Sequence, residues 1–345
     1  MKQDTAKIYV CPYTHEPLTL SAGERRAGEV ISGELVSKSG RTFILREGIA
    51  HLIDEGSEQF SDIEKREYDF YQSSAEAYDA TMDWVFKSFY EDEDEVRENM
   101  LAPLRLTHSS RVLETGCGTC RDSVRIARRL GPDGALFLQD LSPNMLLIGK
   151  RKLDELRAAD RLQCPTELFV GNAARLPFPD GYFDSAFHFG GLNLFSDKRA
   201  AVLEMCRVVR KGGHVVFGDE GLAPWLRETE YGKLLMHNSA LYAYSAPLEC
   251  IPPNARNPSI RWFLGNAYYL IDFEVGNGTP AVNLDLPIVG RRGGTHRTRY
   301  DGKLEGVSPE TKKLAWQAAD RRGMSMHDWL EQVVHSHAQS DLEGN

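Results

Sequence analysis

The segment that begins at Val112 combines an acidic side chain with two closely spaced glycines. The apolar pair Val112 and Leu113 precedes Glu114, and Gly116 and Gly118 follow it. This order predicts a buried strand that ends in a carboxylate and breaks into a turn, with a helix directly after it. Glycines let backbone N–H groups approach a ligand closely, and the acid at the strand end is available for a cationic amine. Because such turns also occur without any ligand, the segment alone defines no site.

Three later segments carry residues that suit the same ligand, and each follows an expected strand. The Asp140 carboxylate can accept both hydroxyls of a ribose, while Leu141 beside it can lie against an adenine face. The amide of Asn172, which precedes Ala173, can read the edge of that base. Gly190 permits close approach of the backbone. Since ligands of parallel sheets bind at the carboxyl ends of the strands, these residues are expected to converge on one site.

The elements that must position these residues alternate between strand and helix over residues 110–220. The expected strands are Arg111–Glu114, Ala135–Gln139, Glu167–Val170, Ser185–Phe189 and His214–Asp219. The expected helices are Asp122–Leu130, Pro143–Arg157 and Lys198–Val209. This alternation predicts an α/β fold in which a Rossmann-like parallel sheet is covered by helices on both faces.

The flanking segments predict three domains. Residues 1–58 contain short apolar strands separated by Gly, Pro and Ser, which predict a small β module. Residues 59–290 hold the main domain, with helical patterns over 61–101 and 222–238 and a strand pair around Gly265. Residues 291–345 form a tail with an expected strand near 298–307 and two helices after it.

Composition limits the class of protein. The chain has 345 residues, of which 41% are hydrophobic, and this is ample for a sizeable core. Its net charge of −9 argues against a surface built to bind nucleic acid. No apolar run reaches the ~18 residues of a membrane span, and the first residues lack the pattern of a signal peptide. Six cysteines without a dense framework fit a reducing compartment, so we expect a cytoplasmic protein.

The motifs together resemble the class I S-adenosylmethionine-dependent methyltransferases. Glu114–Gly118 and Asp140 match the first motif and the ribose acid, and the stretches Leu176–Asp184 and Glu204–Gly213 match the segments before the fourth and fifth strands. The resemblance is closest to the small-molecule branch of the ubiquinone/menaquinone C-methyltransferases and covers roughly residues 67–220. It implies S-adenosyl-L-methionine as the cofactor and methyl transfer to a small-molecule acceptor.

The resemblance also implies a set of cofactor-binding residues. The set is Tyr71, Tyr78, Glu114, Gly116, Gly118, Asp140, Leu141, Asn172, Ala173 and Gly190. The two tyrosines lie on a stretch that looks like the entrance helix of the family. Glu114 and Asn172 each stand where Asp is commoner. A dinucleotide-binding dehydrogenase would place a third glycine at Arg121, so that alternative is disfavoured.

The residues that act on the acceptor are less well defined. A general base is needed only if the acceptor must lose a proton, and the candidates are His188 and Glu220 at the ends of the fourth and fifth strands. The candidate acceptor-binding residues are His237, Tyr242, Arg291 and Arg292. The arginines could bind an anionic group, although a solvated surface or a subunit contact explains them equally well. The sequence does not identify the acceptor atom.

The two ends of the chain resemble further modules. The first 58 residues are similar to the zinc-ribbon-like Trm112 modules, but Cys11 and His15 lack the partners of a four-ligand site, so no metal is expected. The tail resembles a ribbon-helix-helix module, which implies a homodimer. Two other functions remain open: a DNA-binding regulator that uses this tail, and an rRNA or tRNA base methyltransferase. The acidic balance of the chain disfavours both.

Overall fold

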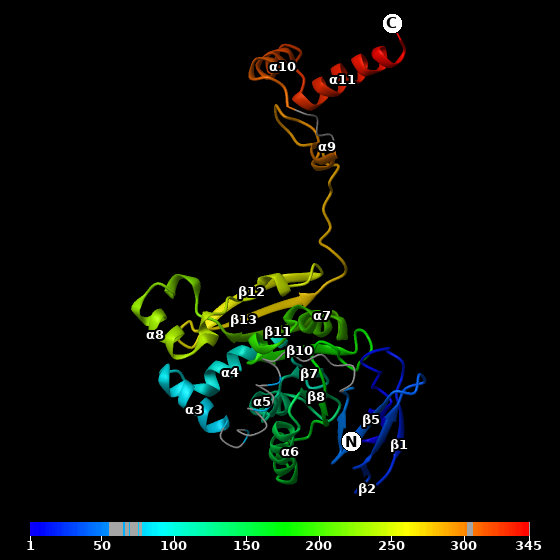
Figure 1. Ribbon diagram of the computed structural model, residues 1–345, viewed down its shortest axis with the longest axis vertical. Helices are drawn as coiled ribbons and strands as arrows, with labels where there is room; N and C mark the ends of the chain where they lie inside the picture. The colour runs from blue at the N-terminus through cyan, green and yellow to red at the C-terminus, as the bar shows by residue number, and fades with distance from the viewer. Residues whose placement is uncertain (55–64, 66–68, 70–74, 76–77, 302–305, 345) are drawn as a thin grey trace. The chain divides into compact units, whose positions relative to one another are not determined.

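The computed structural model describes residues 1–54, 65, 69, 75, 78–301 and 306–344 (Figure 1). These residues form two compact units, Met1–Thr279 and Pro280–Asn345. The predicted domain boundaries at 58 and 290 stay predictions. No helix in the described part of the chain is long and apolar enough to cross a bilayer.

The first unit is built on a mixed sheet that has eleven strands among the described residues, in the order β1-β4-β5-β6-β9-β8-β7-β10-β11-β13-β12. Its centre is parallel and consists of β7 (Arg111–Thr115), β8 (Ala135–Asp140), β9 (Thr166–Val170), β10 (Phe183–Phe189) and β11 (Val209–Glu220). The chain runs outward from β7 through β8 to β9, and then returns to place β10 and β11 on the other side of β7. The strand order therefore switches between β7 and β10, where ligands of such sheets bind.

Helices connect the parallel strands as the sequence predicts. They are α5 (Arg121–Arg129), α6 (Pro143–Ala158) and α7 (Lys198–Val208). The side chain of Ser142 caps α6 by accepting the Met145 N–H at 3.3 Å, with Pro143 in the first turn. Asp197 caps α7 by accepting the Ala200 N–H at 2.8 Å. The predicted Rossmann-like α/β fold is confirmed.

The N-terminal strands continue this sheet. They are β1 (Thr19–Ala22), β4 (Gly33–Val36), β5 (Thr42–Arg46) and β6 (Ile49–His51), with a small separate ribbon of β2 (Arg25–Arg26) and β3 (Glu29–Val30) after the short helix α1 (Gln3–Ala6). Strand β6 pairs in parallel with β9, which joins Ala50 to Phe169. The expected small β module is therefore hydrogen-bonded to the central sheet through β6 and β9.

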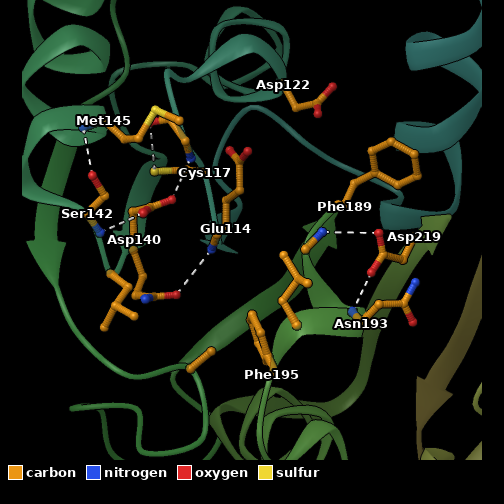
Figure 2. A pocket seen from close by; sticks show the side chains of 18 of the residues that line it. Glu114, Cys117, Asp122, Asp140, Ser142, Met145, Phe189, Asn193, Phe195 and Asp219 are labelled. Carbon is orange, nitrogen blue, oxygen red and sulfur yellow. Dashed lines mark hydrogen bonds between the residues drawn. The ribbon is translucent and has the colours of Figure 1, made fainter. Parts of the chain in front are cut away.

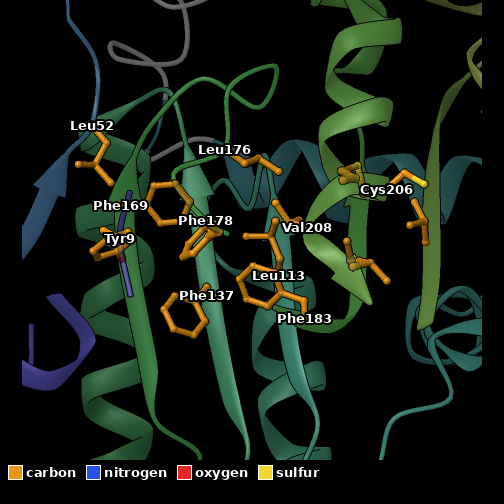
Figure 3. Close-up of a cluster of buried hydrophobic side chains, with 14 of the residues drawn as sticks. Tyr9, Leu52, Leu113, Phe137, Phe169, Leu176, Phe178, Phe183, Cys206 and Val208 are labelled. Atoms are coloured by element: carbon orange, nitrogen blue, oxygen red, sulfur yellow. The ribbon is translucent and has the colours of Figure 1, made fainter. Parts of the chain in front are cut away.

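An aromatic cluster fastens the same segment to the sheet. The rings of Tyr9 and Phe178 lie 5.4 Å apart, and Phe178 also packs against Phe137 and Phe169, each at 5.3 Å (Figure 3). All four side chains are buried. The contacts of Phe178 with Phe137 and Phe169 are edge-to-face, and such contacts stabilise a core beyond the area that they bury.

The remainder of the first unit places helices and a hairpin beside β11. Helices α3 (Tyr78–Ser88) and α4 (Glu93–Leu101) precede β7, and α8 (Glu230–Asn238) follows β11. Strands β12 (Ala255–Phe263) and β13 (Tyr268–Val275) form the expected antiparallel pair, and β13 pairs with β11. The expected helix over 222–238 is shorter, because Pro224 begins a separate 3-10 turn.

The second unit has three helices among its described residues, after a segment without regular secondary structure over 280–295. They are α9 (His296–Asp301), α10 (Pro309–Arg321) and α11 (Met326–Leu342). The two long helices match the prediction, but the strand expected near 298–307 is corrected, because residues 296–301 are helical and 302–305 lie outside the described residues. The strand of a ribbon-helix-helix module forms its hydrogen bonds with the same strand of a second chain. A single chain offers no such partner strand.

The Phe178→Ala variant is expected to lower the free energy of unfolding by about 3–5 kcal/mol, because it empties the centre of the aromatic cluster. Urea unfolding followed by circular dichroism measures the change. The matched control is Tyr90→Ala, since the Tyr90 side chain is 98% exposed. Equal stability of the two variants would contradict this account of the core.

Candidate cofactor and acceptor site

A cavity of about 640 Å³ lies at the carboxyl ends of the central strands (Figure 2). This volume is within the roughly 300–1,000 Å³ that is usual for small-molecule sites. Predicted cofactor residues line it: Glu114, Gly116, Gly118, Asp140, Leu141, Asn172, Ala173 and Gly190. The structure thus brings together the four strand ends that the sequence singled out, at the switch in strand order.

The glycine turn is fixed by the end of β8. The Gly116 N–H donates to Oε1 of Gln139 at 3.1 Å, and the Cys117 N–H donates to the Gln139 carbonyl at 2.9 Å. Gly116 has φ +63°, and a Cβ there would lie 3.0 Å from Cε1 of His188. Both its backbone angle and its surroundings therefore favour glycine.

Asp140 connects the glycine turn to helix α6. Its Oδ2 accepts the Gly118 N–H and its Oδ1 accepts the Ser142 N–H, both at 2.8 Å. Burial raises the pKa of the Asp140 carboxyl, and the backbone hydrogen bonds oppose this rise. A carboxylate oxygen accepts more than one hydrogen bond, so both oxygens can still receive ligand hydroxyls.

Asp219 plays a similar part on the other side of the cavity. Its Oδ1 accepts the N–H groups of Gly191 at 3.1 Å and Glu220 at 2.9 Å, and its Oδ2 accepts the Asn193 N–H at 2.5 Å. Gly190 and Gly191 have φ +86° and +83°. The buried Asp219 carboxylate therefore holds the loop after β10 in a bend that requires glycine.

The two candidate bases occupy different positions. The His188 side chain is buried and does not contribute to the cavity lining; its Nδ1 lies 2.9 Å from the Thr115 carbonyl oxygen, and its ring packs against Phe195. Burial lowers the pKa of His188. Glu220 does line the cavity, and burial, followed by the charge of Asp219, holds its pKa well above the usual range. The geometry thus favours Glu220 over His188 as a residue that meets a ligand.

The other predicted residues lie in several places. Tyr242 is buried behind the lining, with its hydroxyl 3.4 Å from that of Tyr268, which does line the cavity. His237 is exposed on α8 and lies outside the cavity lining. Tyr71 lies outside the described residues, and Tyr78 begins α3 with its side chain outside them.

The predicted arginines belong to the second unit. Arg291 forms an ion pair with Asp320, and its guanidinium lies 5.2 Å from the centre of the Trp316 ring. Arg292 is exposed in the same segment. Both are described within their own unit, so their proposed contact with an acceptor stays a prediction.

Arg97 and Asp122 are among the charged residues that line the cavity and that sequence reasoning missed. Arg97 of α4 is buried and donates from Nη1 to Oδ2 of Asp122 at 2.6 Å. Asp122 could have been found, because it follows the glycine turn directly and lies in the first turn of α5. Arg97 has no such signal, since nothing in the sequence connects α4 to that turn.

Aromatic residues line the cavity near β10 and β13. The Phe189 ring lies 6.1 Å from that of Tyr268, and both rings pack on Phe263. Tyr268 packs against Tyr242 at 5.8 Å. This part of the cavity is therefore suited to an apolar or flat ligand.

Comparison with known proteins identifies the class of the central domain. Residues 112–213 match the family model described as a methyltransferase domain. The chain is 34% identical over 120 residues to the demethylmenaquinone methyltransferase of Geobacillus sp. (strain WCH70). This alignment covers 35% of this chain and 49% of that protein. It is 31% identical over 153 residues to the demethylmenaquinone methyltransferase of Bacillus mycoides (strain KBAB4). This alignment covers 44% of this chain and 61% of that protein.

A solved structure is matched at lower identity. Geranyl diphosphate C-methyltransferase from Streptomyces coelicolor A3(2), in complex with Mg²⁺, geranyl diphosphate and S-adenosyl-L-homocysteine, is 15% identical with a TM-score of 0.42, over 53% of this chain and 79% of that chain. The chain spans about half the length of the curated relatives that it matches.

Residues 112–213 therefore match a methyltransferase domain, the class that the sequence motifs predict. The predicted methyltransferase resemblance is confirmed at the level of this domain. The domain contains the glycine turn, Asp140, Asn172 and Gly190.

The His188→Gln variant is expected to reduce the loss of stability that acid causes. Because burial lowers the pKa of His188 in the folded protein, the unfolded chain alone takes up this proton as the pH falls below about 6.5. The stability that the neutral ring contributes is present above that pH and is lost below it, by up to ~1.4 kcal/mol per pH unit.

Urea unfolding at pH 7.5 and 5.5 measures this effect, with the exposed His237→Gln as the control. A pH dependence that is the same in the wild type and His188→Gln would contradict the assigned burial.

Proposed function

We propose that this chain transfers a methyl group from S-adenosyl-L-methionine to a small-molecule acceptor. The observation that supports this most strongly is the convergence of the glycine turn, Asp140, Asn172 and Gly190 on one cavity. The match of residues 112–213 to the methyltransferase domain family supports the same reaction class. Relatives named as demethylmenaquinone methyltransferases support a small-molecule acceptor.

The residues of the cavity fit the cofactor by their chemistry. The Asp140 carboxylate would hold the ribose hydroxyls, Asn172 and Leu141 would hold the adenine, and the turn at Gly116 would hold the methionine end. When bound, the cofactor supplies an electrophilic methyl group on a sulfonium. The chain's task is to align the acceptor in line with that methyl and to exclude water.

Glu220 and the nearby aromatic rings would bind the acceptor. Phe189 and Tyr268 offer an apolar wall, and Glu220 lies at the end of β11 beside them. Burial, followed by the charge of Asp219, raises the pKa of Glu220 well above the usual range, which favours a protonated carboxyl that donates a hydrogen bond to the acceptor. Asp219 positions this residue through the loop contacts described above.

The Asp140→Ala variant is expected to bind S-adenosyl-L-homocysteine roughly 100-fold more weakly or worse, because two hydrogen bonds to a charged group are lost. Calorimetry measures the affinity, and Asp154→Ala on the exposed side of α6 is the control. A methyl-release screen of the wild type across thiol, phenol, amine and carboxylate acceptors tests the reaction itself.

Two results would refute the proposal: no binding of the cofactor by the wild type, or full affinity in Asp140→Ala. Methyl transfer to tRNA or rRNA with no small-molecule acceptor would instead favour the RNA methyltransferase.

We also propose that the second unit joins two copies of the chain. Among its described residues, Ala319 is the only hydrophobic side chain that is buried. Leu314 is 65% exposed, and Leu330 and Val334 lie four residues apart on α11 with exposures of 39% and 40%. A unit this small with so little core is usually stabilised by association.

The full-length Leu330→Asp/Val334→Asp variant is expected to be monomeric, because two charges would be buried in the interface. Light scattering after size exclusion should give twice the 38.8 kDa chain mass for the wild type and the single mass for the variant. The exposed Leu342→Asp, at the end of α11, is the control. A monomeric wild type would contradict the proposal.

A further inference from the structure

The first turn of helix α3 holds an acidic side chain against the glycine turn. Oδ1 of Asp79 accepts the Thr119 hydroxyl at 2.7 Å, and its Oδ2 accepts the Lys152 ammonium at 2.5 Å. The Lys152 ammonium also donates to the Thr119 carbonyl at 3.0 Å. Three segments that are distant in the chain, namely the start of α3, the glycine turn and α6, therefore meet at one carboxylate.

The Asp79 cluster, which consists of Asp79, Thr119 and Lys152, is partly shielded from water. Thr119 is 1% exposed, and the side chains of Asp79 and Lys152 are 36% and 32% exposed. Burial alone would raise the pKa of Asp79, but the hydrogen bonds from Lys152 and Thr119 hold this pKa below its usual value. Asp79 is therefore ionised at neutral pH, and its contacts are charge-assisted hydrogen bonds.

The glycine turn is held at two successive residues by two different acids. Asp140 accepts the Gly118 N–H at 2.8 Å, and Asp79 accepts the hydroxyl of the next residue, Thr119. Gly118 has φ +51°, so the chain bends between these two contacts. Loss of the Asp79 contact would free the Thr119 end of the turn, while the Gly118 end would stay on Asp140.

Helix α3 also supplies part of the cavity wall. Met82 follows Asp79 by three residues, so both lie on one face of α3, and Met82 lines the cavity as Thr119 does. Asp83, on the same helix, forms an ion pair with Arg121 at 2.7 Å, and this pair connects α3 to α5. Packing of the helix is thus provided for elsewhere, and the contact of Asp79 with the turn itself indicates a role in the site.

We propose that Asp79 is a positioning residue for the methionine end of the cofactor, and that it acts by fixing the glycine turn through Thr119. This inference rests on the proposed function and extends it to the start of α3. Asp79 is not among the described residues that line the cavity, so it acts on the ligand through the turn. Lys152 supports it by joining the carboxylate to the Thr119 carbonyl.

The test compares two ligands by calorimetry on the full-length protein. S-adenosyl-L-homocysteine carries the amino-acid portion of the methionine end, whereas 5′-deoxy-5′-methylthioadenosine stops at the methylated sulfur and lacks that portion. In Asp79→Asn the affinity for the first ligand should fall about tenfold, because a charge-assisted contact that fixes the turn is lost. The affinity for the second should stay within about twofold, since Asp140 still holds the Gly118 end of the turn.

Variants of Thr119 test the route of this effect. Thr119→Val removes the hydroxyl and should also weaken the first ligand about tenfold, whereas Thr119→Ser keeps the hydroxyl and should retain the wild-type affinity. The double variant Asp79→Asn/Thr119→Val should bind no more weakly than the single variants, because both changes remove one contact. The matched control is Asp83→Asn, which removes a carboxylate from the same helix and should leave both affinities unchanged.

The ratio of the two affinities separates positioning from folding, because a smaller folded fraction weakens both ligands equally. If the wild type binds neither ligand, the proposed function fails. If the wild type binds both, but Asp79→Asn weakens them equally or weakens neither, the positioning role alone is overturned. Wild-type affinity for S-adenosyl-L-homocysteine in Thr119→Val would overturn it as well.

Discussion

The two hydrogen bonds that the Asp140 carboxylate accepts determine the shape of the cavity beside β7 and β8. One oxygen holds the turn after β7 through Gly118, and the other holds the start of α6 through Ser142. Two connections that are distant in the chain are thus set by a single side chain at the end of β8. Since backbone N–H groups supply both contacts, the geometry depends little on the identity of the neighbouring side chains. The same carboxylate is then presented to the ligand in a fixed orientation.

Asp219 repeats this arrangement at the end of β11, where it holds the loop of Gly190 and Gly191. The cavity is therefore bounded by two strand-end aspartates, one on either side of the switch in strand order. Each acts through backbone donors. Between them, near the end of β7, Glu114 has a buried oxygen, Oε2, without a hydrogen-bond partner among the described residues. The first two acids hold backbone segments in place, whereas Oε2 of the third makes no such contact within the described residues.

Much of the central fold could be predicted from the sequence, because its strands are short apolar runs and its helices carry clear start signals such as Ser142–Pro143. The join of β6 to β9 could not, since pairing between distant segments leaves no local pattern. His188 resembled a catalytic base, but the alternation of side chains along β10 directs it away from the cavity lining. Arg97 depends on the packing of α4 on α5, which the sequence pattern does not reveal.

The parallel pairing of β6 with β9 has a consequence for folding. The N-terminal strands are synthesised before the strand that they join, because β9 follows β6 in the chain, with β7 and β8 between them. Until β9 forms, β6 presents an unpaired edge, and such edges promote association between chains. Closing this pairing requires a large loop, which slows folding. The pairing of β6 with β9, which joins the N-terminal strands to the central sheet, is therefore expected to form late in folding.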